Sequence, residues 1–350
     1  MRKAGTTQLR MRKARQGSST QLRFPCLYIC ISIHKAEGLG GLRPEARGPG
    51  PTVAAPRTVA VFGASGYQGG SVAMALLKDG SFKVRAITRN PRKKAVQELK
   101  HLGAEIVKAD LDNEKSLLEA LKDVYGVFLV TDYWEYMDKD RELKQGKRVA
   151  DICSQFDVKH IVFSGLENVK KLTDGKLDVP HFDGKGEIEE YFREIGARMT
   201  SVRMPDYFEN FLHVFRPVKS GKEYYVLDIP MGGVPMDGMS VEDLGGVVLA
   251  IFKNPEKYIG KEIGLSTDKL KIEEYAAIMS RHTGKSIQDS KISVKEYEER
   301  NFPGAQELAK MFQFYMKQPD RNKDLTLMLN PEAQSFEEWM SKNKNAFIND

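Results

Sequence analysis

Three glycines spaced three residues apart, between an apolar run and an amphipathic segment, limit the possible fold of this chain more than any other feature. They lie in Gly63–Gly69 (GASGYQG), directly after the apolar run TVAVF at 58–62. The run has the length of a buried strand, and the apolar periodicity that follows, to about Lys78, favours a helix. The first glycine permits a tight turn, the second opens the backbone to a close neighbour, and the third lets helix and strand pack closely. The segment predicts a strand–turn–helix unit.

The alternation of strand and helix continues from residue 58 to residue 204. Strands alternating with helices at this spacing imply a parallel sheet with right-handed crossovers. The predicted fold class is therefore α/β, a Rossmann-type doubly wound parallel sheet, over 58–204. The further strands are expected at 83–88, 104–109, 125–130, 160–164 and 199–204, and the helices near 91–101, 114–122, 138–157 and 185–195.

After Pro205 the pattern loosens, and 205–350 is expected to form a smaller α/β C-terminal lobe. Such a lobe would cover the cleft at the carboxyl ends of the strands. Its strands are predicted at 224–229 and 262–266, and its helices at 241–253, 272–284, 303–317 and 335–347.

Residues 1–57 read as a disordered basic extension. They hold eleven Lys and Arg against two Glu, which gives the tail a net charge of +9. The whole chain has a net charge of +6, so residues 58–350 sum to about −3. The charge therefore gives no support for direct nucleic-acid binding by the body. The tail has the composition of a mitochondrial transit peptide, but an isoform-specific or non-functional extension is the preferred interpretation, and a basic arm that touches nucleic acid is the third.

The glycine turn and the residues after the second strand point to one ligand class. A helix start after such a turn offers free N–H groups and a positive dipole to phosphates. An NAD site places an acid after the second strand, but the segment 88–94 (TRNPRKK) has four cations and no carboxylate. Arg89 stands twenty positions after Gly69, where its guanidinium suits a 2′-phosphate, and Lys93 adds charge. Cations at a helix start oppose the dipole, so a bound phosphate explains them better than solvent. The prediction is NADP(H).

Two later strand ends complete the predicted cofactor site. Asp110 and Leu111, just past the third strand, stand where such folds contact adenine. Thr131, at the end of the fourth strand, stands where the chain passes the nicotinamide-side ribose. The alternative for Asp110 is a cap on the helix at 114–122.

The segments FGASGYQGGSVA, VRAITRNPRKK, HFDGKGEIEEYFR and VRMPDYFENF resemble the NmrA-like branch of the atypical short-chain dehydrogenases, from about Thr58 to the C-terminus. The resemblance implies NADP(H) binding by the glycine turn and Arg89. It also implies a set of residues at the nicotinamide end, although Lys144 alone could be a solvated helix residue. The turn residues are Gly63, Ala64, Ser65, Gly66, Tyr67 and Gln68, and those at the nicotinamide end are Lys144, Lys185, Tyr207, Phe208, Glu209 and Asn210.

The resemblance also locates the place where catalysis would occur. Active short-chain dehydrogenases use Tyr-x-x-x-Lys on a helix, in which the lysine lowers the pKa of the tyrosine. Here Lys185 matches the lysine and Ser164 the family serine, but His181 stands in place of the tyrosine. His181 follows Pro180 and is expected to precede the helix, with its ring directed elsewhere. Ser164, His181 and Lys185 are therefore candidate catalytic residues, but the set lacks the tyrosine that active members use.

Three functions follow from this pattern. The first is an NADP(H)-binding redox sensor with little or no dehydrogenase activity, whose occupancy orders loops such as 131–143. The resemblance supports it, because NmrA proteins act as regulators by binding other proteins, including a GATA-type transcription factor in fungi. The second is an NADPH-dependent reductase of small carbonyls or quinones. The third is an interaction module with a vestigial nucleotide site, against which the intact glycine turn argues.

The remaining expectations concern metals, partners and location. No metal site is expected, because the six His are scattered and the sequence has no HExxH or CxxC motif. No run reaches the ~18 apolar residues of a membrane span. Three cysteines without a disulfide pattern fit a reducing compartment. The resemblance implies a homodimer with regulatory protein partners. We expect the protein in the cytoplasm and also in the nucleus, with the mitochondrion, through the tail, as the alternative.

Overall fold

The computed structural model describes residues 57–221 and 223–348. The predicted tail, up to residue 56, lies outside the described residues. Among the described residues no helix combines the length and the apolar character that crossing a membrane requires.

A parallel sheet of seven strands forms the centre of the fold, in the order β11-β6-β5-β4-β1-β2-β3. Every neighbouring pair in it is parallel. The order reverses direction at β1, as in a doubly wound sheet, so the predicted Rossmann-type α/β class is confirmed. The strands are β1 (Arg57–Val61), β2 (Phe82–Thr88), β3 (Glu105–Lys108), β4 (Gly126–Leu129), β5 (His160–Gly165), β6 (Met199–Arg203) and β11 (Glu262–Gly264).

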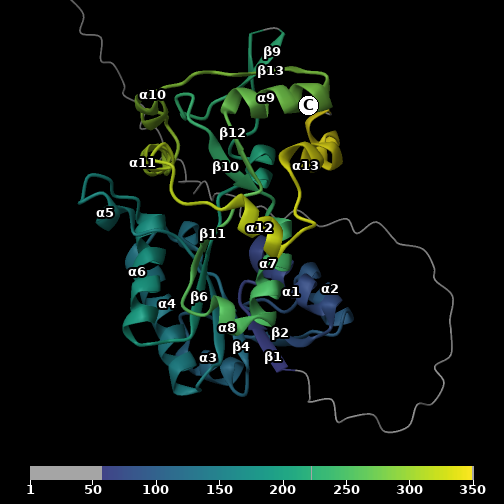
Figure 1. Cartoon of the computed structure of the whole chain (residues 1–350), viewed down its shortest axis with the longest axis vertical. Helices are drawn as coiled ribbons and strands as arrows, with labels where there is room; N and C mark the ends of the chain where they lie inside the picture. Colours follow the sequence, from purple (N-terminus) through teal and green to yellow (C-terminus); the bar gives the residue numbers. More distant parts are fainter. Residues whose placement is uncertain (1–56, 222, 349–350) are drawn as a thin grey trace, which may run out of the picture. The chain divides into compact units, whose positions relative to one another are not determined.

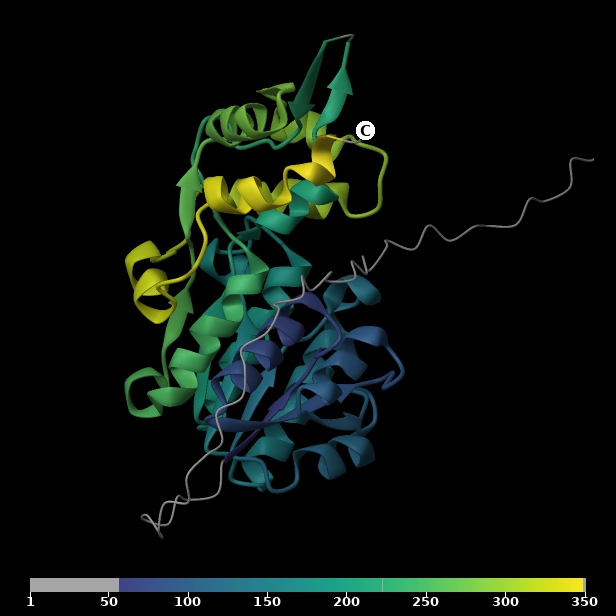
Figure 2. The same ribbon diagram turned by 90° about the vertical axis from the view of Figure 1, so that its right-hand side faces the viewer.

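Helices cover both faces of this sheet because successive strand residues point to opposite sides. In β1, Val59 and Val61 face one cluster of buried side chains, and Ala60 faces the other. The first cluster packs against α1 (Tyr67–Asp79), α2 (Lys94–His101) and α7 (Leu244–Lys253), and the second against α3 (Glu114–Leu121), α4 (Lys139–Gln155) and α6 (Pro180–Glu194). Figures 1 and 2 show these helices around the sheet.

A second core lies among the later elements, beyond the carboxyl ends of the main strands (Figure 1). It is rich in aromatic rings: Phe336 contacts Phe208, Phe211, Tyr275 and Trp339. Two three-stranded sheets, β12-β10-β7 and β13-β9-β8, support it. The strands are β7 (Asp206–Tyr207), β8 (Val218–Ser220), β9 (Tyr224–Leu227), β10 (Met236–Met239), β12 (Asp268–Leu270) and β13 (Ser286–Asp289), and the longer helices are α9 (Ile272–Thr283), α11 (Ala305–Tyr315) and α13 (Phe336–Asn343).

Short elements connect these units. Three are 3₁₀ helices and five are helices of four to seven residues. They are η1 (Tyr133–Glu135), η2 (Phe208–Leu212), η3 (Val241–Asp243), α5 (Val169–Leu172), α8 (Pro255–Tyr258), α10 (Val294–Glu298), α12 (Lys323–Leu329) and α14 (Asn345–Ile348).

Two elements predicted for the smaller lobe are part of the main α/β unit instead, one as a strand of its sheet and one as a helix packed on that sheet. The strand expected at 262–266 is β11, which pairs with β6. The helix expected at 241–253 is largely α7, whose Val247, Val248 and Ile251 are fully buried in the cluster that contains Val59. The physical reason is that β6 would otherwise be an open edge, and the apolar face above β1 needs a second helix beside α1 (Figure 2). The boundary at residue 205 therefore does not separate two independent sheets.

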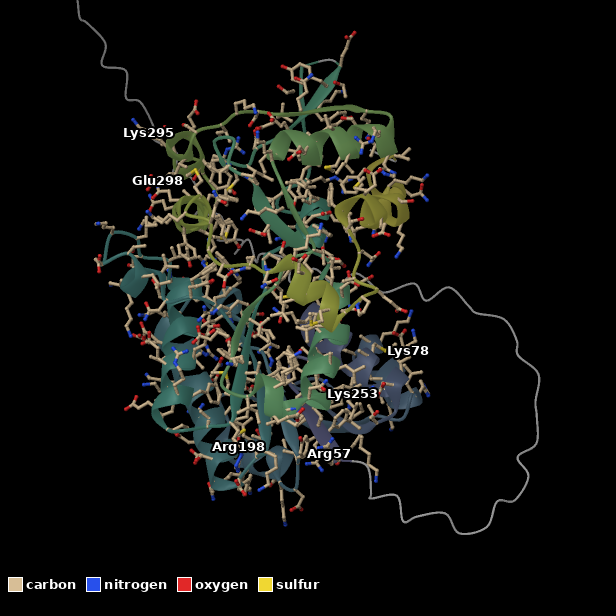
Figure 3. The ribbon with its side chains drawn as sticks, viewed as in Figure 1. Arg57, Lys78, Arg198, Lys253, Lys295 and Glu298 are labelled. Carbon is tan, nitrogen blue, oxygen red and sulfur yellow. The ribbon has the colours of Figure 1, made fainter. Side chains whose placement is uncertain are left out.

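The amino-terminal edge of the sheet carries solvated basic residues. Arg57 begins β1, and Arg198, which pairs with Asp157, directly precedes β6; both are labelled near one end of the molecule in Figure 3. Lys253, at the end of α7, pairs with Asp79 at the end of α1. The predicted site residues after β1, β2, β3 and β4 all lie at the opposite, carboxyl edge.

Candidate functional site

The glycine turn after β1 has the geometry that its sequence predicts. Gly63 has φ +63°, a left-handed conformation that glycine adopts without strain, and its carbonyl accepts the N–H of Gly66 at 2.8 Å. Gly66 is the N-cap of α1. A Cβ on Gly69 would overlap the carbonyl oxygens of Phe62 and Gly63. Gly63 and Gly66 are exposed, so the turn presents open backbone at a helix N-terminus, which suits a phosphate.

The cationic segment follows β2 with little secondary structure of its own. Arg89 is exposed, and α2 begins at Lys94 with Lys93 as its N-cap, three residues later than predicted. The side chain of Asn90 accepts the N–H of Arg92 at 3.0 Å, which forms a turn that delays the helix. Lys93 is thus at the helix start, where the sequence predicts that it adds positive charge.

Arg89 contacts a carboxylate that the sequence reasoning did not find. Its Nη1 donates to Glu135 Oε1 at 2.6 Å, and the hydroxyl of Tyr136 lies 3.5 Å from the same nitrogen. Glu135 ends η1, 46 residues further along the chain. The sequence places no acid after β2, but the fold brings one to the same place from the segment after β4.

The end of β3 holds Asp110 and Leu111 beside this ion pair. The Oδ1 of Asp110 accepts the N–H of Asp112 at 3.0 Å, and the carbonyl of Leu111 accepts Arg148 at 2.6 Å. The cap of α3 is Asn113, whose side chain accepts the N–H of Ser116. The alternative interpretation of Asp110 as the helix cap is therefore wrong, because Asn113 stands one residue before the helix.

Lys185 and Thr131 meet at a buried carboxylate. The Nζ of Lys185 donates to the carbonyl and hydroxyl oxygens of Thr131, at 2.9 and 2.7 Å, and to Glu142 Oε1 at 2.7 Å. The hydroxyl of Thr131 donates to the same oxygen at 2.6 Å. The other oxygen of Glu142 is buried without a hydrogen-bond partner among the described residues. We did not predict Glu142. The sequence feature that indicates Glu142 is its position: it is a charged residue on the face of α4 that is otherwise small and apolar, formed by Gly146, Val149 and Cys153.

His181 lies inside α6, which corrects the expectation that it precedes the helix. The helix begins at Pro180, so His181 is in its first turn, one turn before Lys185. Proline at the first helical position is favourable, because its missing N–H has no partner to lose there. The ring of His181 is buried and lies 4.8 Å from the ring of Trp134, measured between centroids.

Glu307, from α11, fixes the position of the His181 ring through hydrogen bonds. Its Oε1 lies 2.6 Å from His181 Nδ1 and accepts the backbone N–H of His181 at 2.9 Å, and its Oε2 accepts the Tyr133 hydroxyl at 2.9 Å. Burial opposes ionisation of Glu307, but the hydrogen bonds from His181 and Tyr133 hold its pKa below the usual range. Burial and the Glu307 charge raise the pKa of Tyr133, so this phenol stays protonated as a donor.

Two predicted residues do not join these clusters. Ser164 is buried in β5, and none of the hydrogen bonds of the described residues links it to His181 or Lys185. Lys144 is exposed on α4. Its neighbours Arg141 and Gln145 donate to Asp112 in the loop before α3, whereas Glu142 meets Lys185 of α6.

Only one residue of the segment Tyr207–Asn210 reaches the glycine turn. The hydroxyl of Tyr207 accepts Gln68 Nε2 at 2.6 Å, which joins α1 to β7. Phe208 is buried against Phe336, and Glu209 accepts hydrogen bonds from Ser240, Val241 and Trp339. The amide of Asn210 donates to Asp206 at 2.6 Å. Phe208 and Glu209 therefore contribute packing and buried hydrogen bonds to the second core.

Asp206 makes the stability of the protein depend on pH. Burial, with the Glu209 charge, raises its pKa to about 7, although Asn210 donates to it, and its Oδ2 has no partner among the described residues. The folded state therefore holds a proton on Asp206 that the unfolded state releases near pH 4, so the contribution of this group to stability falls as pH rises from about 4 to about 7.

We expect Asp206→Asn to be more stable than the parent protein at pH 8, by on the order of 4 kcal/mol, because the pKa of Asp206 rises from about 4 to about 7 on folding. At pH 4 the two proteins should unfold at nearly the same urea concentration. Urea denaturation at both values measures this, with Asp140→Asn, an exposed change on α4, as the control. Parallel pH profiles for the parent protein and Asp206→Asn would contradict the assignment.

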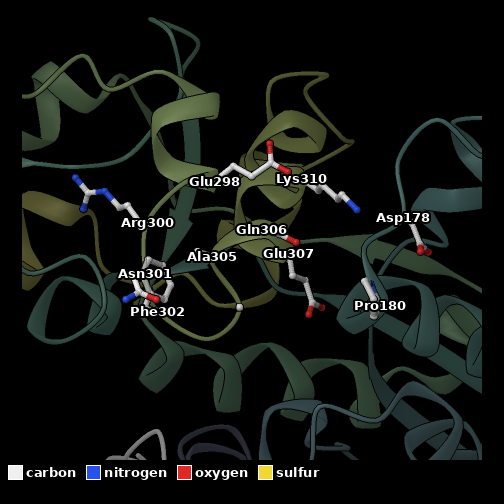
Figure 4. A pocket seen from close by; sticks show the side chains of 11 residues that line it. Asp178, Pro180, Glu298, Arg300, Asn301, Phe302, Ala305, Gln306, Glu307 and Lys310 are labelled. Carbon is white, nitrogen blue, oxygen red and sulfur yellow. The ribbon is translucent and has the colours of Figure 1, made fainter.

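A pocket of about 380 Å³ opens on the outer side of Glu307 (Figure 4). Its wall is formed by α11, the segment before it and the start of α6, and its charges are mixed, with Glu298 and Lys310 both bordering it. Neither the glycine turn nor Arg89 lines it. Its lining residues are Asp178, Pro180, Glu298, Arg300, Asn301, Phe302, Gly304, Ala305, Gln306, Glu307 and Lys310.

The described residues contain no group of three or more His, Cys, Asp or Glu side chains arranged to hold a metal ion. Cys153 is buried in α4, and burial raises the pKa of its thiol to about 12. A thiol with such a pKa is a poor nucleophile.

Comparison with known proteins gives one consistent family. The model of the NmrA-like family matches residues 56–341. An NmrA-like family domain-containing protein of Dictyostelium discoideum is 37% identical over 250 residues, covering 69% of this chain and 82% of that protein. An NmrA-like family domain-containing oxidoreductase of a Cladobotryum species is 32% identical, covering 73% of this chain and 83% of its own length.

Solved structures share the fold. NmrA, a negative transcriptional regulator, in complex with NADP has a TM-score of 0.69 at 19% identity, covering 82% of this chain and 94% of that one. The complex of the same regulator with NAD has a TM-score of 0.70, also at 19% identity and with the same coverage. At this identity the likeness concerns the arrangement of the elements.

Proposed function

The chain belongs to the NmrA-like family, and on that premise we propose that it is a regulatory protein that binds NADP(H) and senses it, with little or no dehydrogenase activity. One observation carries the proposal. The two cations expected to face the cofactor, Arg89 and Lys185, are both held by residues of the segment 131–142.

The residues present fit the dinucleotide. The open backbone of Gly63 and Gly66 suits a pyrophosphate, and Arg89 suits a 2′-phosphate. Lys185, in α6 beside the end of β4, suits the nicotinamide-side ribose. When bound, NADPH supplies a transferable hydride; the residues named here bind and orient.

Occupancy changes the partners of the segment 131–142 at two places. Arg89 must exchange Glu135 for a phosphate, and Lys185 must share its contacts with Thr131 and Glu142 with ribose hydroxyls. A ligand shifts a conformational equilibrium by its difference in affinity for the two states. Cofactor occupancy therefore changes the conformation of the segment and of the surface that it forms. The proposed result is a changed contact with a protein partner or with a second copy of this chain.

The weak-catalysis part of the proposal rests on the environment of His181. It stands where an active relative has the phenol, and its Nδ1 is engaged by Glu307 at 2.6 Å. Lys185 has no tyrosine to activate, because its ammonium group donates hydrogen bonds to Thr131 and Glu142 and to no tyrosine of the described residues. The high pKa of Tyr133 makes that phenol a poor acid as well.

The second candidate is an NADPH-dependent reductase of small carbonyls or quinones. A specific observation favours it: Glu307 orients the His181 ring from one side and lines a pocket of about 380 Å³ on the other. A carboxylate that fixes one ring nitrogen leaves the other for proton transfer. The Cladobotryum relative is named an oxidoreductase.

One experiment separates the two. The full chain is titrated with NADPH, NADP⁺ and NADH by calorimetry, and NADPH consumption is followed against a panel of carbonyls and quinones. Selective NADP(H) binding without turnover, with altered amide hydrogen exchange in 131–142, supports the sensor. Turnover that His181→Ala abolishes establishes the reductase instead. Failure to bind any of the three overturns both.

A further inference from the structure

The Arg89–Glu135 ion pair lies at the carboxyl edge of the sheet, beside the expected dinucleotide site. In the sheet, β1 lies between β2 and β4. Arg89 directly follows β2, and Glu135 lies in η1 after β4, so their side chains meet across the carboxyl end of β1. That strand end is where the glycine turn starts. The pair therefore bridges the two strands that flank the expected pyrophosphate position.

The charge of Arg89 is already compensated from within the chain. The hydrogen bond to Glu135, outweighing partial burial, together with the charges of Glu135 and Asp110, raises the pKa of the guanidinium. Arg89 therefore stays a cation and pairs with a carboxylate before any phosphate arrives. A 2′-phosphate carries about −1.5 to −2 charges and accepts bidentate hydrogen bonds from Arg, so it competes well for this partner.

A neutral ribose hydroxyl cannot compete in the same way. It can donate a hydrogen bond to a carboxylate, which is the contact an NAD site normally provides from the end of the second strand. This chain has no acid there, but Glu135 brings one to the same place. In the paired arrangement, the Glu135 carboxylate can accept a hydrogen bond from the ribose hydroxyl of NAD(H), whereas Arg89 is not free to bind the 2′-phosphate of NADP(H) until the pair breaks.

We propose that Glu135 determines the cofactor discrimination of this site: it occupies Arg89 until a 2′-phosphate replaces it, so NADP(H) opens the segment 131–142 rather than ordering it, and NAD(H) leaves it closed. This inference rests on the proposed function and deepens it. The signal that the protein senses is then the phosphorylated dinucleotide pool against the unphosphorylated one.

The size of the effect follows from exposure. The side chains of Arg89 and Glu135 are 51% and 29% exposed, and exposed ion pairs shift equilibria about 2- to 5-fold. The test is Glu135→Gln, which keeps the shape and removes the charge. The matched control is Glu273→Gln, which removes an ion pair of similar length, to Lys291 at 2.8 Å with 52% and 59% of the side chains exposed, on α9, where it touches neither Arg89 nor the segment 131–142.

Calorimetric titration of each full-length variant measures the ratio of NADPH to NADH affinity. In Glu135→Gln we expect NADPH to bind about 2- to 5-fold more tightly and NADH no more tightly than in the parent protein, with no change of ratio in Glu273→Gln. An unchanged ratio, in a protein that binds NADPH, overturns the role of Glu135 and leaves the proposed function standing. Absence of NADPH binding by parent and variant overturns both.

A second readout needs no nicotinamide. Adenosine 2′,5′-bisphosphate and AMP differ only in the 2′-phosphate, and amide hydrogen exchange over 131–138 reports whether the segment opens. We expect the bisphosphate, and not AMP, to speed exchange in the parent protein. In Glu135→Gln exchange should be fast without ligand. Equal effects of the two nucleotides in the parent protein overturn the proposal.

Discussion

Replacing Arg89 by glutamate is expected to weaken NADPH binding by about 100-fold or more, because it removes charge-assisted hydrogen bonds to the 2′-phosphate and adds a repelling charge. NADH affinity should change far less. The free energy of unfolding should also change little, since the ion pair that Arg89 forms with Glu135 is exposed. Titration of the full-length variant with both dinucleotides measures the difference.

The control for this substitution is Arg198→Glu. It makes the same change of charge at the amino-terminal edge of the sheet, where Arg198 pairs with exposed Asp157. We expect this variant to keep the parent affinity for NADPH. Equal affinity of Arg89→Glu and the parent protein would remove the 2′-phosphate argument, and an equal loss in both variants would assign the effect to net charge.

The second large effect is expected at Gly69, where alanine should prevent α1 from packing on β1. The added Cβ would overlap two backbone oxygens, which no rotamer change can relieve. Overpacking of this kind costs about 3 kcal/mol or more, a fall in melting temperature of roughly 5–10 °C. Calorimetric melting measures it, and NADPH binding should fall as well because the turn is displaced.

Gly70→Ala is the matched control, one residue further along the same helix. A Cβ there would lie 3.6 Å from the carbonyl oxygen of Ala64, an ordinary contact. Alanine is the better helix former, so this variant should be as stable as the parent protein or up to about 1 kcal/mol more stable. Similar melting temperatures for the two variants would mean that the close approach at Gly69 does not constrain the fold.

The local parts of this fold were predictable from sequence because each has a short-range cause. Apolar runs predict the strands of the main sheet to within about two residues, and the glycine turn has the conformation that its spacing requires. The helix at Pro180 was predicted to begin five residues late, because HFDGK has no strong apolar periodicity and its buried face depends on α4 and Glu307.

The contacts that give the candidate site its chemistry were not predictable. Arg89 meets Glu135 across 46 residues, and His181 meets Glu307 across 126. No periodicity or motif links such pairs, because they exist only when the sheet order brings strand ends together. The same limit applies to Tyr207–Asn210, where the sequence cannot tell that Tyr207 faces Gln68 while Glu209 faces Trp339.

Because β11 completes the main sheet and α7 covers one of its faces, the order of synthesis and the possible sites of recombination are constrained. A nascent chain that has emerged only to residue 204 lacks both the strand that pairs with β6 and the helix that covers Val59 and Val61. At ribosomal speeds the next sixty residues take about 3–12 s, during which an open strand edge and an uncovered apolar face are prone to aggregation. Recombination at residue 204 would likewise divide one sheet between two parents, so the dinucleotide-binding half cannot pass between genes as a separate cassette.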